Sequence, residues 1–219
     1  MSYQNFDDFV ASEANHVPLT PLSFLPRTAL MYPDRRAIVY GDRSYTWQSF
    51  FHRCQKLASA LNGAGVSKGD TVAVLAANTP EMIEAHFGVP MSGAVLNTIN
   101  TRLDDETIAY ILEHGEAKVF IVDYELAPQA KDALNILKDN DLLVIDILDY
   151  QNSTAPASMG RTDYESFLSS GSEEDQWHMP SDEWDAIGLS YTSGTSGRPK
   201  GVVYHHRGSY LMSMGTIAD

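Results

Sequence analysis

The middle of the chain alternates between short apolar runs and segments whose apolar residues recur at helical spacing. Thr71–Ala77 and Lys118–Val122 are almost continuously apolar, which is typical of strands buried on both faces of a sheet. In the segment from Phe50 to Leu61, apolar residues repeat every three or four positions instead. The alternation predicts an α/β fold: layered sheets with parallel βαβ units flanked by helices.

Residues at the segment boundaries support these elements. Thr46, Thr79 and Asp104 each stand where a helix N-cap is expected, and Pro80 suits a first helical turn. Gly41-Asp42 predicts a two-residue turn between two short strands. The expected helices cover about 47–61, 80–92, 105–113 and 126–137. The expected strands cover about 37–40, 43–45, 71–77, 94–96, 118–122, 142–147, 186–191 and 201–204.

The same pattern divides the chain into four regions. Residues 1–36 are predicted to be an irregular N-terminal segment, because proline interrupts them four times. Residues 37–148 form the βαβ sheet region, and 149–183 are a polar connection, expected to be exposed apart from a short helix near 164–168. Residues 184–219 comprise a strand, a glycine-rich loop, a returning strand and the start of a helix, with 217–219 as a truncated end.

Charge and cysteine content narrow the function. The 219 residues include 15 basic and 29 acidic side chains, a formal net charge of -14. This balance argues against binding to nucleic acid or to an anionic membrane surface, so any polyanionic ligand needs local donors. Cys54 is the only cysteine, and no apolar run approaches the ~20 residues of a membrane span. We expect a cytoplasmic protein, with a peroxisomal address as the alternative.

The run Tyr191–Gly201, YTSGTSGRPKG, contains the candidate chemistry. Its glycines leave backbone N–H groups accessible, and successive N–H groups can form a concave site for phosphate. Its hydroxyl groups can add donors or bind magnesium, and Lys200 supplies a positive charge. The candidate ligands of a polyphosphate are Thr192, Ser193, Gly194, Thr195, Ser196, Gly197 and Lys200.

This run differs from the common P-loop, G-x-x-x-x-G-K-[ST], in which lysine follows glycine and opens a helix. Here Pro199 precedes Lys200, and Gly201–Tyr204 has the pattern of a returning strand. The loop is therefore predicted to join two strands, which leaves it less constrained than a loop anchored on a helix.

Tyr191–Gly201 closely resembles the signature loop of the adenylate-forming superfamily, which includes acyl- and aryl-CoA synthetases, luciferases and peptide-synthetase adenylation domains. Ser196 stands where many members have threonine, a mild departure that keeps a hydroxyl. Gly41–Trp47 and Gly69–Ala73 also resemble family segments. Glu84–Gly88, Gly93–Leu103 and Val203–Gly208 resemble one branch of the superfamily, the acyl-CoA synthetases of short- and medium-chain acids. This branch includes plant acyl-activating enzymes and methylmercaptopropionate-CoA ligases.

The resemblance implies an AMP-forming carboxylate–CoA ligase that uses ATP, Mg²⁺ and CoA. In family terms, Thr192 lies near magnesium, the hydroxyls and glycines of the loop hold phosphate, and Lys200 is the catalytic residue that neutralises charge. The implied partners are a small carboxylic acid, ATP and CoA, with no nucleic acid or membrane span and a possible homo-oligomer.

Family members are more than twice as long, and their adenine site, acyl pocket and second catalytic lysine lie downstream. We therefore expect the N-terminal portion of a larger enzyme, inactive on its own. Two alternatives stay open: an adenylation domain that feeds a carrier protein, and a non-catalytic nucleotide-binding or oligomerisation module.

Other polar groups have simpler interpretations. His205 and His206 are adjacent, without cysteine or acid at ligand spacing, so a structural role is favoured over ligand contact. Thr98, Asn100, Thr101 and Arg102 follow a predicted strand, where a capping and loop role is favoured over ligand binding.

Overall fold

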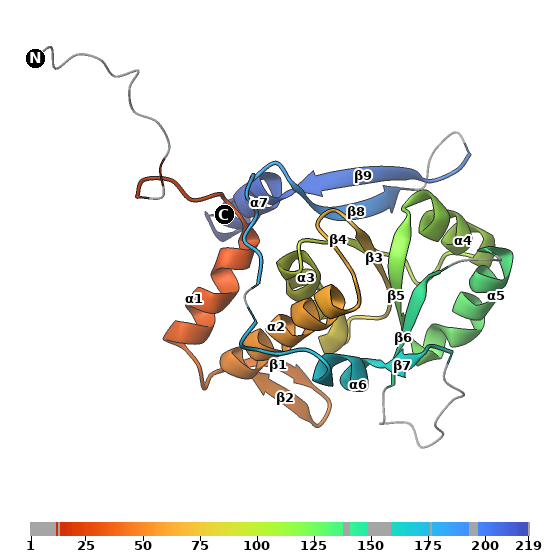
Figure 1. Cartoon of the computed structure of the whole chain (residues 1–219), viewed down its shortest axis with the longest axis horizontal. Coiled ribbons are helices and arrows are strands. Elements are labelled where there is room, and N and C mark those ends of the chain that lie inside the picture. Colours follow the sequence, from red (N-terminus) through yellow and green to blue (C-terminus); the bar gives the residue numbers. More distant parts are fainter. Residues whose placement is uncertain are drawn as a thin grey trace, which may run out of the picture.

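The computed structural model describes residues 12, 14–137, 141–148, 159–175, 177–192 and 197–218. A seven-stranded sheet has the order β7-β6-β5-β3-β4-β8-β9, and a separate two-stranded sheet pairs β1 with β2 (Figure 1). The pairs from β7 to β8 are parallel, and β9 returns antiparallel along β8. The predicted α/β class with parallel βαβ units is confirmed.

The described strands are β1 Arg36–Tyr40, β2 Arg43–Thr46, β3 Thr71–Leu75, β4 Val95–Thr98, β5 Ala117–Asp123, β6 Leu143–Ile147, β7 Thr162–Asp163, β8 Ala186–Thr192 and β9 Lys200–His205. The described α-helices are α1 Phe24–Met31, α2 Trp47–Gly63, α3 Pro80–Met91, α4 Asp105–His114, α5 Ala127–Leu137, α6 Tyr164–Ser169 and α7 His206–Ala218. Short 3-10 turns precede α1 (η2, Pro21–Ser23) and α5 (η3, Tyr124–Leu126).

Local sequence accounts for many of these boundaries. The side chains of Thr46, Thr79 and Asp104 cap α2, α3 and α4, each accepting a hydrogen bond from the backbone N–H three residues ahead. The predicted β1–β2 hairpin is present, and Gly41 in its turn has a φ of 55°. The three N-cap predictions and the hairpin prediction are confirmed.

Two apolar clusters sandwich the central strands. Val72 and Val74 of β3 face the cluster formed with α2, α3 and α6, whereas Ala73 and Leu75 face the cluster formed with α4 and α5. Every residue of β3 is buried. The helices thus form a layer on each side of the sheet, as the continuous apolar runs predict.

Two expectations about the flanking regions are wrong. The N-terminal region was expected to be irregular, yet α1 forms there, because Pro26 occupies the first helical turn and Leu25 and Ala29 are buried. The 149–183 region was expected to be an exposed connection beyond its short helix. Within it, β7 extends the sheet, which contradicts that expectation. The expected short helix is confirmed as α6, which buries Tyr164, Phe167 and Leu168 against the core. Residues 149–158 lie outside the described residues.

Candidate phosphate-binding site

A cavity of about 890 Å³ lies at the carboxyl ends of β3, β4 and β8. β3 leads into α3 on one face of the sheet, and its neighbour β4 leads into α4 on the other face. Adjacent strands that lead to opposite faces leave a crevice between their ends, where ligands of open α/β sheets bind. The lining residues are Ala76, Ala77, Asn78, Met82, His86, Thr98, Ile99, Asn100, Thr101, Leu103, Ile111, Ser190, Tyr191 and Thr192.

The glycine-rich loop joins this cavity to a hairpin. β8 and β9 pair antiparallel, and Thr192 lies directly opposite Lys200 in the register. Directly opposite residues project from the same face with Cβ atoms about 5 Å apart, so the side chains of Thr192 and Lys200 leave the same face where the loop begins and ends. The prediction that the loop joins two strands is confirmed.

The structure describes some of the predicted loop residues. Thr192, Gly197 and Lys200 are exposed, and Gly197 has a φ of 122°, which favours glycine. At Gly201 a Cβ would make a tight contact, 3.1 Å from Leu189 Cδ1. The predicted phosphate ligands Ser193, Gly194, Thr195 and Ser196 lie outside the described residues, and their roles stay predictions.

The cavity is suited to an anion by its composition. Among its lining residues in the described part of the chain, none is aspartate or glutamate, although the protein as a whole has a net charge of -14. Hydroxyl, amide and imidazole groups provide the polar surface instead. A bound phosphate would therefore meet no carboxylate in the lining, and several of the polar side chains can donate hydrogen bonds to it.

The polar residues after β4 reach this cavity. Thr98, Asn100 and Thr101 line it, and Asn100 Oδ1 also accepts a hydrogen bond from the backbone N–H of Arg102 at 3.0 Å. The expected loop role is present at Asn100. Whether these side chains also contact a ligand stays a prediction. The carboxyl end of a central parallel strand was the signal available in the sequence.

Sequence reasoning did not single out His86 as a cavity residue. His86 lies on α3, one turn after Met82, and its Nδ1 hydrogen-bonds to the Met82 carbonyl oxygen at 2.8 Å. Both residues line the cavity. If Nδ1 carries the proton, Nε2 is left as an acceptor in the neutral ring. The i, i+4 spacing at the start of a helix that follows a buried strand could have indicated this position.

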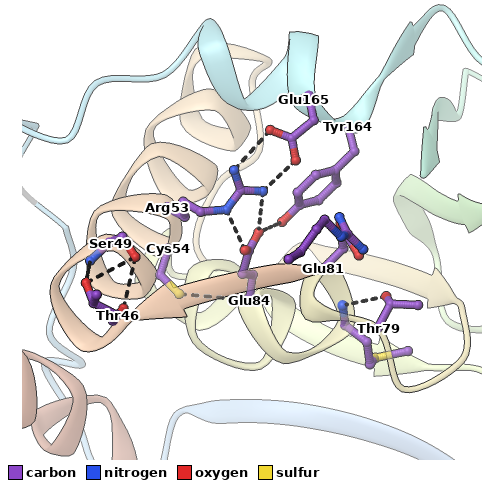
Figure 2. A network of polar contacts seen from close by, with 11 residues as sticks. Thr46, Ser49, Arg53, Cys54, Thr79, Glu81, Glu84, Tyr164 and Glu165 are labelled. Carbon is purple, nitrogen blue, oxygen red and sulfur yellow. Dashed lines mark hydrogen bonds and ion pairs between the residues drawn. The ribbon is translucent and has the colours of Figure 1, made fainter. Parts of the chain in front are cut away.

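A network of charged side chains around the buried Glu84 links α3 to α2 and α6 (Figure 2). Arg53 of α2 contacts Glu84 of α3 with 2.6 Å between Nε and Oε1, and Glu165 of α6 with 2.6 Å between Nη2 and Oε1. The Tyr164 hydroxyl donates to Glu84 Oε2 at 2.9 Å. Burial raises the pKa of Glu84, while Arg53 and Tyr164 lower it in part. The network therefore fixes the helix that carries Met82 and His86.

The paired histidines have structural contacts. His206 begins α7, is buried and has its Nδ1 2.8 Å from Thr20 Oγ1. Burial lowers the pKa of His206 to about 4, so the ring is neutral at pH 7. His205 Nδ1 accepts a hydrogen bond from the backbone N–H of Gly208 at 2.9 Å. Neither histidine lines the cavity beside Thr192.

The described residues include no group of three or more His, Cys, Asp or Glu side chains arranged to hold a metal ion. Magnesium bound to nucleotide phosphates needs only one or two protein ligands, because phosphate and water oxygens complete its shell. The exposed hydroxyl of Thr192, free of a neighbouring carboxylate in the cavity lining, is compatible with that mode of binding.

Comparison with known proteins defines the family. Residues 25–218 match the family model described as AMP-binding enzyme. The chain belongs to this family. It is 43% identical over 225 residues to the acetate/butyrate–CoA ligase AAE7, peroxisomal, of Arabidopsis thaliana, covering 97% of this chain and 39% of that protein. It is 44% identical to the trans-cinnamate:CoA ligase, peroxisomal, of Petunia hybrida, covering 96% of this chain and 39% of that protein.

Solved structures support the fold of this AMP-binding chain. It superposes on the anthranilate CoA ligase AuaEII in complex with anthranoyl-AMP with a TM-score of 0.78 at 24% identity, over 90% of this chain and 37% of that one. A putative long-chain-fatty-acid CoA ligase from Rhodopseudomonas palustris CGA009 gives 0.76 at 26% identity, over 92% and 48%. The chain thus spans about two fifths of the curated relatives named above.

Proposed function

We propose that this chain is the phosphate-binding part of an AMP-forming carboxylate–CoA ligase that acts on a short- or medium-chain acid. The observation that carries the proposal is that Thr192 lines a cavity without a lining carboxylate and pairs directly with Lys200 across the hairpin. Family membership and the CoA ligase names of the relatives support the same reaction class.

The proposed reaction has two steps. A carboxylate oxygen of the acid attacks the α-phosphorus of ATP, the bond to the bridging oxygen breaks, and pyrophosphate leaves with an acyl-adenylate formed. The thiol of CoA then attacks the acyl carbon, loses its proton and displaces AMP, which yields the thioester. Magnesium, bound through Thr192, would neutralise phosphate charge.

Within this scheme, the residues of the loop act through position and charge. Lys200 offsets the negative charge that builds on the leaving pyrophosphate, and the loop glycines and hydroxyls hold its oxygens. Because Lys200 faces the same side as Thr192, both can reach one phosphate group. Thr98, Asn100 and His86 supply further polar groups of the cavity lining.

The test is a Lys200→Ala change in the protein that carries this chain, with both half-reactions measured. Loss of a charge that stabilises the leaving group should slow ATP–pyrophosphate exchange about a hundredfold, with a smaller effect on thioester formation from supplied acyl-adenylate. Lys131→Ala, on the exposed side of α5, is the matched control and should change neither step. Equal losses in the two half-reactions would contradict the role of Lys200.

Three further points belong to this proposal. The 219 residues alone are expected to form no acyl-adenylate. They correspond to about two fifths of the relatives, and the family resemblance places the second catalytic lysine outside that part. A carrier protein in place of CoA is the alternative acceptor, distinguished by a thiol-acceptor assay. Location in the cytoplasm or the peroxisome, and assembly as a homo-oligomer, stay predictions; the described residues include no helix able to cross a membrane.

A further inference from the structure

Both arms of the glycine-rich loop contact the same helix. Tyr191, in the arm that enters the loop, and Arg198, in the arm that leaves it, each pack against a side chain of α4. The helix residues involved are Tyr110 and His114, which are four positions apart and lie one turn from each other on the same face. We call these four residues the α4 clamp.

The contacts in the α4 clamp are specific. His114 Nδ1 and the Tyr191 hydroxyl are 2.8 Å apart, at hydrogen-bond distance. The guanidinium carbon of Arg198 lies 5.2 Å from the centre of the Tyr110 ring, a cation–π distance. The rings of Tyr110 and His114 are 5.2 Å apart, and Tyr110 meets Tyr191 edge to face at 6.5 Å. The clamp is therefore one connected set of rings with a cation at its edge.

Close packing at the end of α4 supports the first of these contacts. A Cβ at Gly115 would lie 2.8 Å from the Ile111 carbonyl oxygen and 3.3 Å from the Tyr191 hydroxyl. A larger residue at position 115 would crowd both the last turn of α4 and the Tyr191 hydroxyl. Glycine at this position therefore leaves room for the Tyr191 hydroxyl beside the end of α4.

The second contact sits apart from the anion cavity. Arg198 and Pro199 line a separate hollow of about 590 Å³ against α4 and α5, together with Glu106 and Glu113. Thr192 lines the cavity at the carboxyl ends of the strands instead. Arg198 therefore anchors the outgoing arm to the helix layer. Thr192 and Lys200 stay paired with each other across the β8–β9 hairpin.

We infer that Tyr110 and His114 are positioning residues: they hold both arms of the loop before nucleotide binds and so raise its affinity for phosphate. This inference rests on the proposed function. Ordering a loop in advance reduces the conformational entropy lost on binding, which improves affinity without any contact to the ligand. A cation–π contact at a partly exposed site corresponds to an effect of about two- to fivefold.

The first test measures binding of Mg·ATP by calorimetry to the protein that carries this chain, because the family resemblance places the adenine site downstream. Tyr110→Leu and Arg198→Ala should each raise the dissociation constant about two- to fivefold, and the double variant should be no weaker than either single variant. Tyr110→Phe keeps the ring and should bind like the wild type. Arg27→Ala, which removes an exposed arginine of α1, controls for net charge. Additive losses, or equal affinity of the Leu and Phe variants, would overturn the inference.

The second test needs no nucleotide. Hydrogen exchange of Ser190–Thr192 and Gly197–Gly201 should be faster in Tyr110→Leu and in Tyr191→Phe than in the wild type, with exchange in β5 unchanged. Equal exchange in all three proteins would show that the clamp does not hold the arms. If the protein that carries this chain failed to bind Mg·ATP, that result would count against the proposed function. The exchange result would still decide whether the clamp holds the arms.

Discussion

Two parts of the same sheet differ in how they are covered. β3 and β5, at the centre, lie between the α2–α3–α6 layer and the α4–α5 layer, and all of β3 is buried. The β8–β9 hairpin lies at one edge (Figure 1). In β9 the side chain of Val203 is 62% exposed, and in α7 that of Met212 is 69% exposed.

The difference follows from the connections between strands. Each parallel step in the centre needs a crossover, and the crossover helix covers the sheet. The return from β8 to β9 is a hairpin, so it adds a strand and a loop but no covering helix. A hairpin edge can therefore place a loop at a ligand site, whereas the covered centre provides the rigid platform on which the site stands.

The largest expected effect concerns the charged network that holds the covering helices. Glu84→Gln removes a fully buried partner of Arg53 and should lower the free energy of unfolding by about 3–5 kcal/mol. Glu165→Gln, at a carboxylate that is 49% exposed, should lower it by about 1 kcal/mol or less. Urea denaturation followed by circular dichroism measures both. Similar losses for the two variants would mean that the buried Arg53–Glu84 pair contributes no more to stability than the exposed Arg53–Glu165 pair.

The same substitution in the two parts of the sheet gives the sharpest comparison. Val72→Ala in β3 removes fully buried methyl groups and should lower the free energy of unfolding by about 2–3 kcal/mol. Val203→Ala in β9 should change it by less than about 0.5 kcal/mol. Urea denaturation of both variants tests the difference: the midpoint should shift for Val72→Ala and hardly for Val203→Ala, with the slope of the transition unchanged. A large loss at Val203 would show that the edge is covered in solution.

The last prediction is a pH dependence of stability at the end of the hairpin. The pKa of His206 is about 4 in the folded chain against an ordinary 6.5, so between these values the unfolded state binds more protons. Its contribution to stability is complete above pH 6.5 and is lost as the pH falls towards 4. The unfolding free energy of His206→Asn should therefore fall less steeply over this range than that of the wild type. Parallel profiles for the two proteins would exclude His206 as the titrating group.

Local signals in the sequence were sufficient for the central elements. The caps Thr46, Thr79 and Asp104 and the buried run of β3 each depend on a few neighbouring residues, and all are present. The α1 helix was missed because proline was counted as a break, although its position in a first turn allows a helix. The burial of α6 depends on contact with α2, more than 100 residues earlier in the chain, which no local pattern shows.

The sequence by itself determined the α/β class, the hairpin that bounds the glycine-rich loop and the candidate residues Thr192 and Lys200, because these follow from short-range patterns. Only the tertiary structure decided that Thr98, Asn100 and His86 line one cavity with Thr192, and that α4 contacts both arms of the loop. The physical reason is that strand order brings together residues that are distant in the chain, and pairing between parallel strands leaves no signature in the sequence of either strand alone.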